Sequence, residues 1–317
     1  MSFSFPRFGS GSTLCALLWV GCTAQPETQT RNRRIAERYD TSPLDVNALD
    51  TDSAARIRVL AMPVGEVVTR LDSLRFKARS YFAFSRGNRE LTQADRYEAH
   101  FDANNNYHAV IDGGDEKVEA IGVGDTLYVR HNRGHFRRKA SREAEARDRW
   151  GALAWSSLRG ALEPFFGRLV LEKGPSESLQ GRQTIRYRLK LGARSREDEQ
   201  VVSALPVRTL PTAPPSRWRE TAKALGLSGD IWVDADTGVV LQSKFEGRLE
   251  VEDRDVRPTQ LIVRYQSEIL EPSIAPSVEP PPNSREEYSR TPRPVDRLSF
   301  FRDRIPLEEA ETENRPP

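Results

Sequence analysis

Two histidines bracket a predicted tight turn, and their spacing makes them the first candidates for metal chemistry. His131 and His135 flank the turn Asn132-Arg133-Gly134, so both imidazoles could reach one ion. Zinc sites in proteins use three or four ligands, and a two-histidine match falls short of that number. The next candidate, His108, belongs to another predicted hairpin. The pattern therefore favours ordinary surface histidines, and we predict no metal and no cofactor.

Asp234-Ala235-Asp236-Thr237-Gly238 contains two motifs with possible chemistry. It begins like a calcium loop, but the glycine comes one position early and Phe245 occupies the place of the bidentate glutamate. Its Asp-Thr-Gly triplet matches aspartic proteases, which need a second carboxylate to share a proton, and the chain has no second triplet. We interpret the segment as a type I turn with a glycine bulge.

Other catalytic signatures are absent from the sequence. It has no Gly-x-Ser-x-Gly elbow, no phosphate-binding glycine loop and no dinucleotide fingerprint. Carboxylates scattered along the chain can still meet in space, but the sequence predicts that the protein is not an enzyme.

Aromatic residues recur on the predicted strands, and they suggest a binding surface instead. They are Phe76, Phe82, Phe84, Tyr97, Phe101, Tyr107, Tyr128 and Trp232. If one concave sheet carries them on a single face, they can line an apolar cavity beneath helices. The alternative is that they simply form the core, as aromatic residues on strands usually do. A curved sheet with a helical lid satisfies both interpretations.

The N-terminus has the layout of a secretory signal peptide. Arg7 gives a positive n-region, and an apolar stretch runs from Thr13 to Val20. This stretch is shorter than the ~20 residues that a membrane-spanning helix needs. We therefore predict export from the cytoplasm, with residues 1–21 removed.

The end of that stretch predicts a lipid anchor. Trp19-Val20-Gly21-Cys22 resembles a bacterial lipobox, in which the cysteine is acylated with chains such as palmitate and becomes the first mature residue. Trp19 stands where that motif usually has leucine, and ordinary secretion with cleavage after Ala24 is the alternative. No acidic residue directly follows Cys22, which favours the outer membrane, with the protein facing the periplasm.

Composition excludes some classes of function. The 317 residues carry a net charge of only +2, so no basic field predicts nucleic-acid binding. The only cysteines are Cys15 and Cys22, so the predicted mature domain has no disulfide, no thiol nucleophile and no cysteine-bound zinc.

The hydrophobic pattern divides the chain into four parts: signal peptide 1–21, flexible tether 22–44, folded domain 45–271 and a Pro-rich, largely disordered tail 272–317. Helical spacing over 45–74 is interrupted at Pro63, and a second helical region over 142–166 is closed by Pro164. Predicted strands are 75–84, 97–101, 107–111, 118–123, 126–131, 135–139, 169–173, 184–191, 229–233, 239–251 and 260–270. A surface loop is predicted over 194–215 and a short helical turn over 218–225.

The hairpin Gly-Asp-Ile-Trp-Val-Asp-Ala-Asp-Thr-Gly-Val-Val-Leu, residues 229–241, resembles the LolA/LolB-like group, which includes the LppX and LprG lipoproteins and the N-terminal domain of RseB. Residues 125–130 are similar to a second strand of that pattern. The resemblance covers 45–271 and implies an α+β fold, a curved antiparallel half-barrel with helices packed over its concave face. It also implies an apolar cavity for acyl chains.

These observations lead to one main hypothesis, a membrane-anchored envelope lipoprotein that binds or transfers a lipid or lipoprotein acyl chain. The predicted cavity-lining residues are Phe76, Phe82, Phe84, Tyr97, Tyr107, Tyr128 and Trp232. Two alternatives remain open: an RseB-like sensor with an envelope protein partner, and a structural scaffold whose sheet is a solid core.

Overall fold

The computed structural model describes residues 42–86, 89–114, 116–140, 144–193, 222–252 and 258–286. The predicted signal peptide, Cys22, most of the predicted tether and the predicted loop over 194–215 lie outside the described residues.

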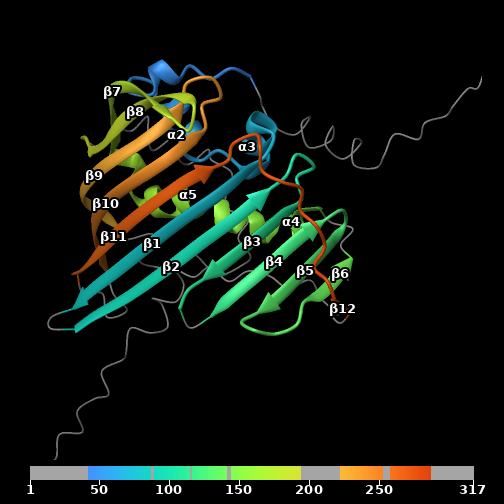
Figure 1. Cartoon of the computed structure of the whole chain (residues 1–317). Helices are drawn as coiled ribbons and strands as arrows, with labels where there is room; N and C mark the ends of the chain where they lie inside the picture. Colours follow the sequence, from blue (N-terminus) through green and yellow to red (C-terminus); the bar gives the residue numbers. More distant parts are fainter. Residues whose placement is uncertain are drawn as a thin grey trace, which may run out of the picture.

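One 12-stranded sheet organises the described chain, in the order β12-β6-β5-β4-β3-β2-β1-β11-β10-β9-β8-β7 (Figure 1). All neighbours are antiparallel except β12 and β6. The strands are β1 Leu74–Arg86, β2 Arg89–Phe101, β3 Tyr107–Asp112, β4 Lys117–Val123, β5 Thr126–His131, β6 Arg137–Ala140, β7 Leu169–Leu179, β8 Arg182–Leu191, β9 Lys223–Asp234, β10 Val240–Glu252, β11 Pro258–Leu270 and β12 Arg285–Glu286.

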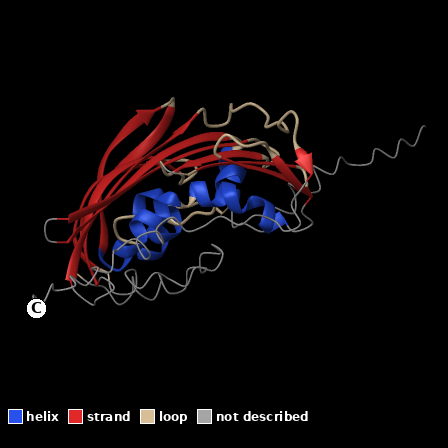
Figure 2. Cartoon of the chain, turned by 90° about the horizontal axis from the view of Figure 1, so that it is seen from below, coloured by secondary structure: helices blue, strands red, loops and turns tan. Residues whose placement is uncertain are grey.

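The helices lie beneath the arch of the sheet (Figure 2). We call the face that they cover the inner face, and the opposite face the outer face. The helices are η1 Val46–Ala48, α2 Ser53–Leu60, α3 Val64–Leu71, α4 Ala144–Trp155, α5 Ser157–Leu162 and η2 Glu163–Arg168. The predicted fold class, a curved antiparallel sheet with helices over its concave side, is confirmed.

Local signals place the helix ends. The Asp52 side chain accepts hydrogen bonds from the backbone N–H groups of Ala54 and Ala55 and so caps α2. Pro63 separates α2 from α3 as predicted, because proline cannot continue the hydrogen-bond ladder of a helix interior. The predicted helix over 142–166 is interrupted at Ser156, which separates α4 from α5.

Alternation along β1 shows why the sheet has two different faces. Phe76, Phe82 and Phe84 are each 3% exposed on the inner face. Lys77 and Arg79, at the intervening positions, are exposed on the outer face. Successive side chains of a strand point to opposite faces, so this period-2 pattern predicted the orientation of β1 correctly.

The predicted helical turn over 218–225 is wrong where the structure describes it. β9 begins at Lys223, whose register partner is Glu250 of β10. Ala224 is buried and Leu225 is exposed, which is the alternation of a strand. Pairing with β10 therefore overrides the weak helical signal of this short segment.

The start of the predicted disordered tail is packed against the sheet. Residues 272–286 cross the outer face (Figure 1), where Val278 joins a small apolar cluster with Ile121, Tyr128 and Phe136. The Val278 N–H donates to the Asp102 carboxylate at 3.0 Å. Order in the described chain thus extends past residue 271 to β12.

Candidate functional site

The inner face brings five of the seven predicted cavity residues together. Phe76, Phe82, Phe84, Tyr97 and Tyr107 belong to one continuous apolar cluster between the sheet and the helices, and Phe101 joins them. The Phe76 ring lies 5.0 Å from the ring of Trp155 in α4, measured between centroids. Phe76 therefore lies at the interface between the sheet and α4, and so do Phe101 and Tyr107, whose rings lie against Gly151.

Tyr128 and Trp232 lie on the outer face, so neither can line a cavity beneath the helices. Tyr128 belongs to the cluster around Val278. Trp232 donates from Nε1 to the Glu177 carboxylate at 3.1 Å, and the Arg186 guanidinium lies 5.4 Å from its ring centroid. Their strand neighbours point inward instead, because side chains alternate along a strand. That parity was visible in the sequence, and including these two residues was wrong.

Helices and sheet are in close contact at two described points of the inner face. A Cβ atom added to Gly247 of β10 would lie 2.3 Å from Cζ of Phe165 in η2. A Cβ atom added to Gly151 of α4 would lie 3.0 Å from ring atoms of Phe101 and Tyr107. At these points the helical layer touches the sheet directly, with glycine supplying the necessary room.

Specific polar contacts attach the helical layer to the rest of the molecule. Trp155 Nε1 donates to the Met62 carbonyl at 2.7 Å. The Ser157 hydroxyl lies 2.9 Å from the Tyr265 hydroxyl, which joins the start of α5 to β11. Burial raises the pKa of Tyr265, so this phenol remains neutral. In the first turn of α4, the buried Arg147 donates to the Asn105 carbonyl at 3.2 Å.

The inner face also contains buried polar residues that the sequence analysis missed. Asp95 is 1% exposed; its carboxylate accepts from Gln93 Nε2 at 2.9 Å and from the Tyr97 hydroxyl at 3.3 Å. Ser243 and Ser267 are hydrogen-bonded at 2.7 Å. The available signal was the polar residue types at inward positions of strands that are otherwise apolar.

Two of the histidines considered for metal binding are within hydrogen-bond distance of carboxylates. His131 Nδ1 lies 3.1 Å from Glu116, and His108 Nε2 lies 2.8 Å from Glu119. Among the described residues, no group of three or more His, Cys, Asp or Glu side chains is placed to hold a metal ion.

The Asp234 segment forms the turn that its sequence predicts. The Asp234 carboxylate accepts from the backbone N–H groups of Asp236 and Thr237 at 3.1 and 2.8 Å, and Gly238 adopts a φ of +70°. Burial favours the protonated form of Asp234, but hydrogen bonds from Arg182 and Thr237 outweigh it and hold the pKa below its ordinary value. Asp234 is therefore a structural residue.

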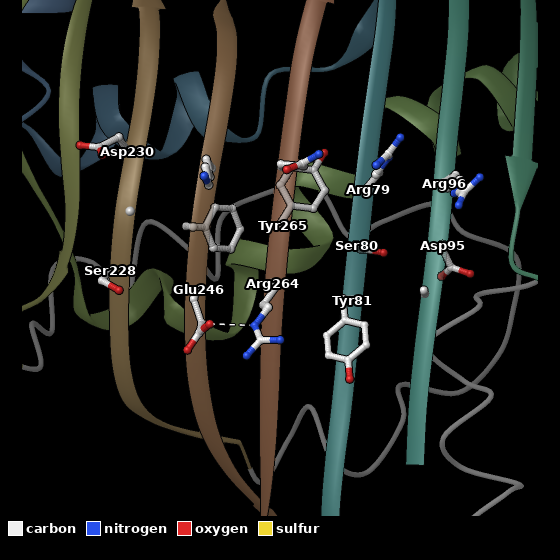
Figure 3. Close-up of a pocket in the computed structure, with 15 residues that line it drawn as sticks. Arg79, Ser80, Tyr81, Asp95, Arg96, Ser228, Asp230, Glu246, Arg264 and Tyr265 are labelled. Carbon is white, nitrogen blue, oxygen red and sulfur yellow. Dashed lines mark hydrogen bonds and ion pairs between the residues drawn. The ribbon is translucent and has the colours of Figure 1, made fainter. Parts of the chain in front are cut away.

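A depression of about 690 Å³ lies over the middle of the sheet. Three consecutive residues from each of five neighbouring strands, β2, β1, β11, β10 and β9, line it (Figure 3). Its exposed side chains include Arg79, Arg96, Lys244, Glu246 and Arg264, all on the outer face. The lining is thus charged, unlike the apolar cavity that the sequence predicted.

No protein-family model matches the chain, and no curated protein matches it in sequence. Among solved structures, it is similar to the lipoprotein LppX of Mycobacterium tuberculosis, with 15% identity over 69% of this chain and 96% of that chain and a TM-score of 0.28. LprF of Mycobacterium bovis has 11% identity over 73% and 96% of the two chains and a TM-score of 0.27. The LolA superfamily protein NE2245 of Nitrosomonas europaea has 12% identity over 67% and 95%, with a TM-score of 0.20.

LppX and the LolA superfamily are the groups that the hairpin sequence resembles. At these identities and TM-scores, the likeness does not extend to a ligand or a partner. The fold assignment rests on the strand order and the helix placement of this chain. Within the described residues, none of the helices has the length and the apolar character needed to cross a membrane.

Proposed function

We propose that this protein is a non-catalytic, lipid-anchored protein of the bacterial envelope that binds a hydrophobic ligand on the inner face of its sheet. The observation that carries the proposal is the continuous apolar surface between the sheet and a layer of short helices. A protein needs such a surface to receive an acyl chain, and burial of the chain contributes about 0.8 kcal/mol per CH₂.

Because η2 and α4 contact the sheet directly at Gly247 and Gly151, binding at these points requires the helical layer to move. The layer is divided at Ser156 into α4 and α5, and the Ser157–Tyr265 hydrogen bond attaches α5 to β11. An acyl chain that replaces helix side chains on the sheet offsets the cost of exposing them. In this mechanism the aromatic residues serve as core in the closed form and as binding surface in the open form.

A structural scaffold is the second candidate function, and the packing at Gly247 favours it. Phe165 occupies the space above this glycine, as in a core that never opens. A scaffold and a binder differ in whether the purified protein takes up lipid, so this property separates them.

Native mass spectrometry of the full chain, purified from its membrane in mild detergent, tests the proposal. We expect a lipid adduct, or uptake of added palmitate after the lipid is removed. Tyr265→Phe removes the hydroxyl that holds α5 and should accelerate uptake, whereas Trp232→Ala on the outer face should leave it unchanged. Absence of both adduct and uptake in every variant would favour the scaffold.

The proposed anchor is tested separately. Cys22→Ser removes the only side chain in the lipobox-like motif that can be acylated. We expect the variant to move from the membrane to the soluble envelope fraction, measured by fractionation and immunoblotting. Unchanged membrane retention would contradict the anchor without affecting ligand binding.

A further inference from the structure

Two neighbouring rows of charged residues on the outer face differ in whether cations lie directly opposite each other. Lys77 of β1 has Glu98 of β2 and Glu268 of β11 as its register partners. Two residues along β1, Arg79 has Arg96 and Gln266 as its register partners. Like charges directly opposite each other destabilise a sheet. The Arg79–Arg96 pair therefore carries a cost that the Lys77 row avoids, and Asp112 of β3 offsets part of it on the other side of Arg96.

The row continues with a third cation on β10. Lys244 is the register partner of Gln266, so Arg96, Arg79 and Lys244 lie in one line across the sheet. At ~4.8 Å per strand, the line spans about 14 Å between its first and last Cα atoms. Arg79 and Arg96 lie side by side at the same level of the sheet (Figure 3). All three cations line the depression of about 690 Å³.

Acidic residues around the depression are already engaged. Glu246 is bound to Arg264 at 2.8 Å, and Asp230 is bound to Arg186 at 2.9 Å. By contrast, the side chains of Arg79, Arg96 and Lys244 are exposed and form no ion pair or hydrogen bond with another side chain in the described part of the chain. Asp112 of β3 and Asp230 of β9 are the register partners at the two ends of the row, next to Arg96 and Lys244. Asp112 accepts from the Gly114 N–H at 3.1 Å. Arg79 is thus the cation of this row that has no acidic register partner.

We propose that this depression binds a phosphate group. Two neighbouring guanidinium groups present planar N–H forks that match phosphate oxygens, and Lys244 adds a third positive charge. A dianionic phosphate would relieve the repulsion between Arg79 and Arg96. Tyr81 lies two residues along β1 from Arg79, and the Arg264 guanidinium is 5.5 Å from its ring centroid. Its aromatic ring gives the depression a surface that the rest of the ligand can contact. A soluble phosphate ester and a lipid phosphate headgroup share this chemistry. The site lies on the face opposite the proposed hydrophobic one and does not depend on it.

Isothermal titration with inorganic pyrophosphate, and co-sedimentation with vesicles of phosphatidic acid in phosphatidylcholine, test the site with the full chain. Binding in either assay supports it, and the assay that succeeds identifies a soluble or a lipid source. The double variant Arg79→Gln/Arg96→Gln should weaken binding at least tenfold, and Lys244→Gln by a smaller factor.

Lys77→Gln is the matched control, because Lys77 is an exposed cation on the same strand and outer face. It should leave the affinity within twofold of the parent. Thermal unfolding of each variant confirms that the sheet is intact. Absence of binding in both assays would overturn the proposal, and so would an equal loss in Lys77→Gln, which would indicate general charge attraction.

Discussion

The two faces of this sheet are built from the same strands but have opposite character. On β9, Ile231 and Val233 are 0% exposed beneath the helices, whereas Trp232 between them lies on the outer face against Arg186 and Glu177. The inner face is an apolar interface interrupted by a few buried polar groups, such as Asp95 and the Ser243–Ser267 pair. The outer face is a network of charges and aromatic rings. Strand parity, rather than residue type, therefore decides what an aromatic residue does here.

Removal of one aromatic residue from each face should show this difference most strongly. Phe165→Ala leaves a cavity in the core beneath η2 and should destabilise the fold by about 4 kcal/mol. Trp232→Ala on the outer face removes a partly exposed ring and one hydrogen bond, for about 1 kcal/mol. Urea unfolding measures both values. Equal losses would contradict the assignment of the two faces.

The buried ion pair at the hairpin tip should have the next largest effect. Asp234→Ala leaves Arg182 without its partner and should cost about 3 kcal/mol. Because the pKa of Asp234 is lowered in the folded state, its contribution is complete at neutral pH and is lost as pH falls below about 4.

Unfolding midpoints measured between pH 3 and 7 check this. The parent should lose stability toward the acid end more steeply than Asp234→Ala. The control Glu246→Gln, in an exposed pair on the outer face, should follow the parent curve. Parallel curves for the parent and Asp234→Ala would refute the assigned role.

Alanine substitutions at two glycines test how much free space lies above the sheet at each position. Gly247→Ala places a methyl group against Phe165 and should destabilise by about 2 kcal/mol through overpacking. Gly226→Ala on β9 meets only the flexible end of Arg248 at 3.4 Å, so its effect should stay within about 0.5 kcal/mol. A tolerated alanine at Gly247 would mean that the helical layer is loose enough to yield there.

The smallest effects should differ in sign between neighbouring rows of the outer face. Lys77→Gln removes a cation placed between two glutamates and should destabilise by a few tenths of a kcal/mol. Arg79→Gln removes a like-charge pair and should stabilise by a similar amount. Thermal unfolding at low salt resolves the two, and added salt should reduce both shifts. The same sign for both variants would remove the energetic argument for an anion site.

Local patterns predicted much of this fold. The period-2 alternation from Phe76 to Phe84 gave the inner face of β1, and Pro63 gave the break between α2 and α3. The sequence Asp234–Gly238 predicted the hairpin turn. An aspartate that accepts from the N–H groups that follow it, and a glycine at positive φ, determine a turn without help from distant residues.

Contacts between residues that are far apart in the chain could not be predicted from the sequence. Nothing near Val278 indicates that it packs against β4 and β5, and residues around Lys223 are extended because β10 pairs with them. Lys244 joins the row of Arg96 and Arg79 only because β11 pairs with both β1 and β10, and β10 lies far from β1 in the chain. The closure of the inner face by Phe165 likewise follows from tertiary packing.

Residue-resolved amide hydrogen exchange, measured with and without palmitate, tests the central claim that the helical layer opens while the sheet stays intact. We expect amides of α4 and α5 to exchange through local opening, much faster than those of β1 and β11. Palmitate should change exchange only in the helical layer and on the inner face. Exchange of helices and strands together, through global unfolding alone and without any effect of palmitate, would contradict it.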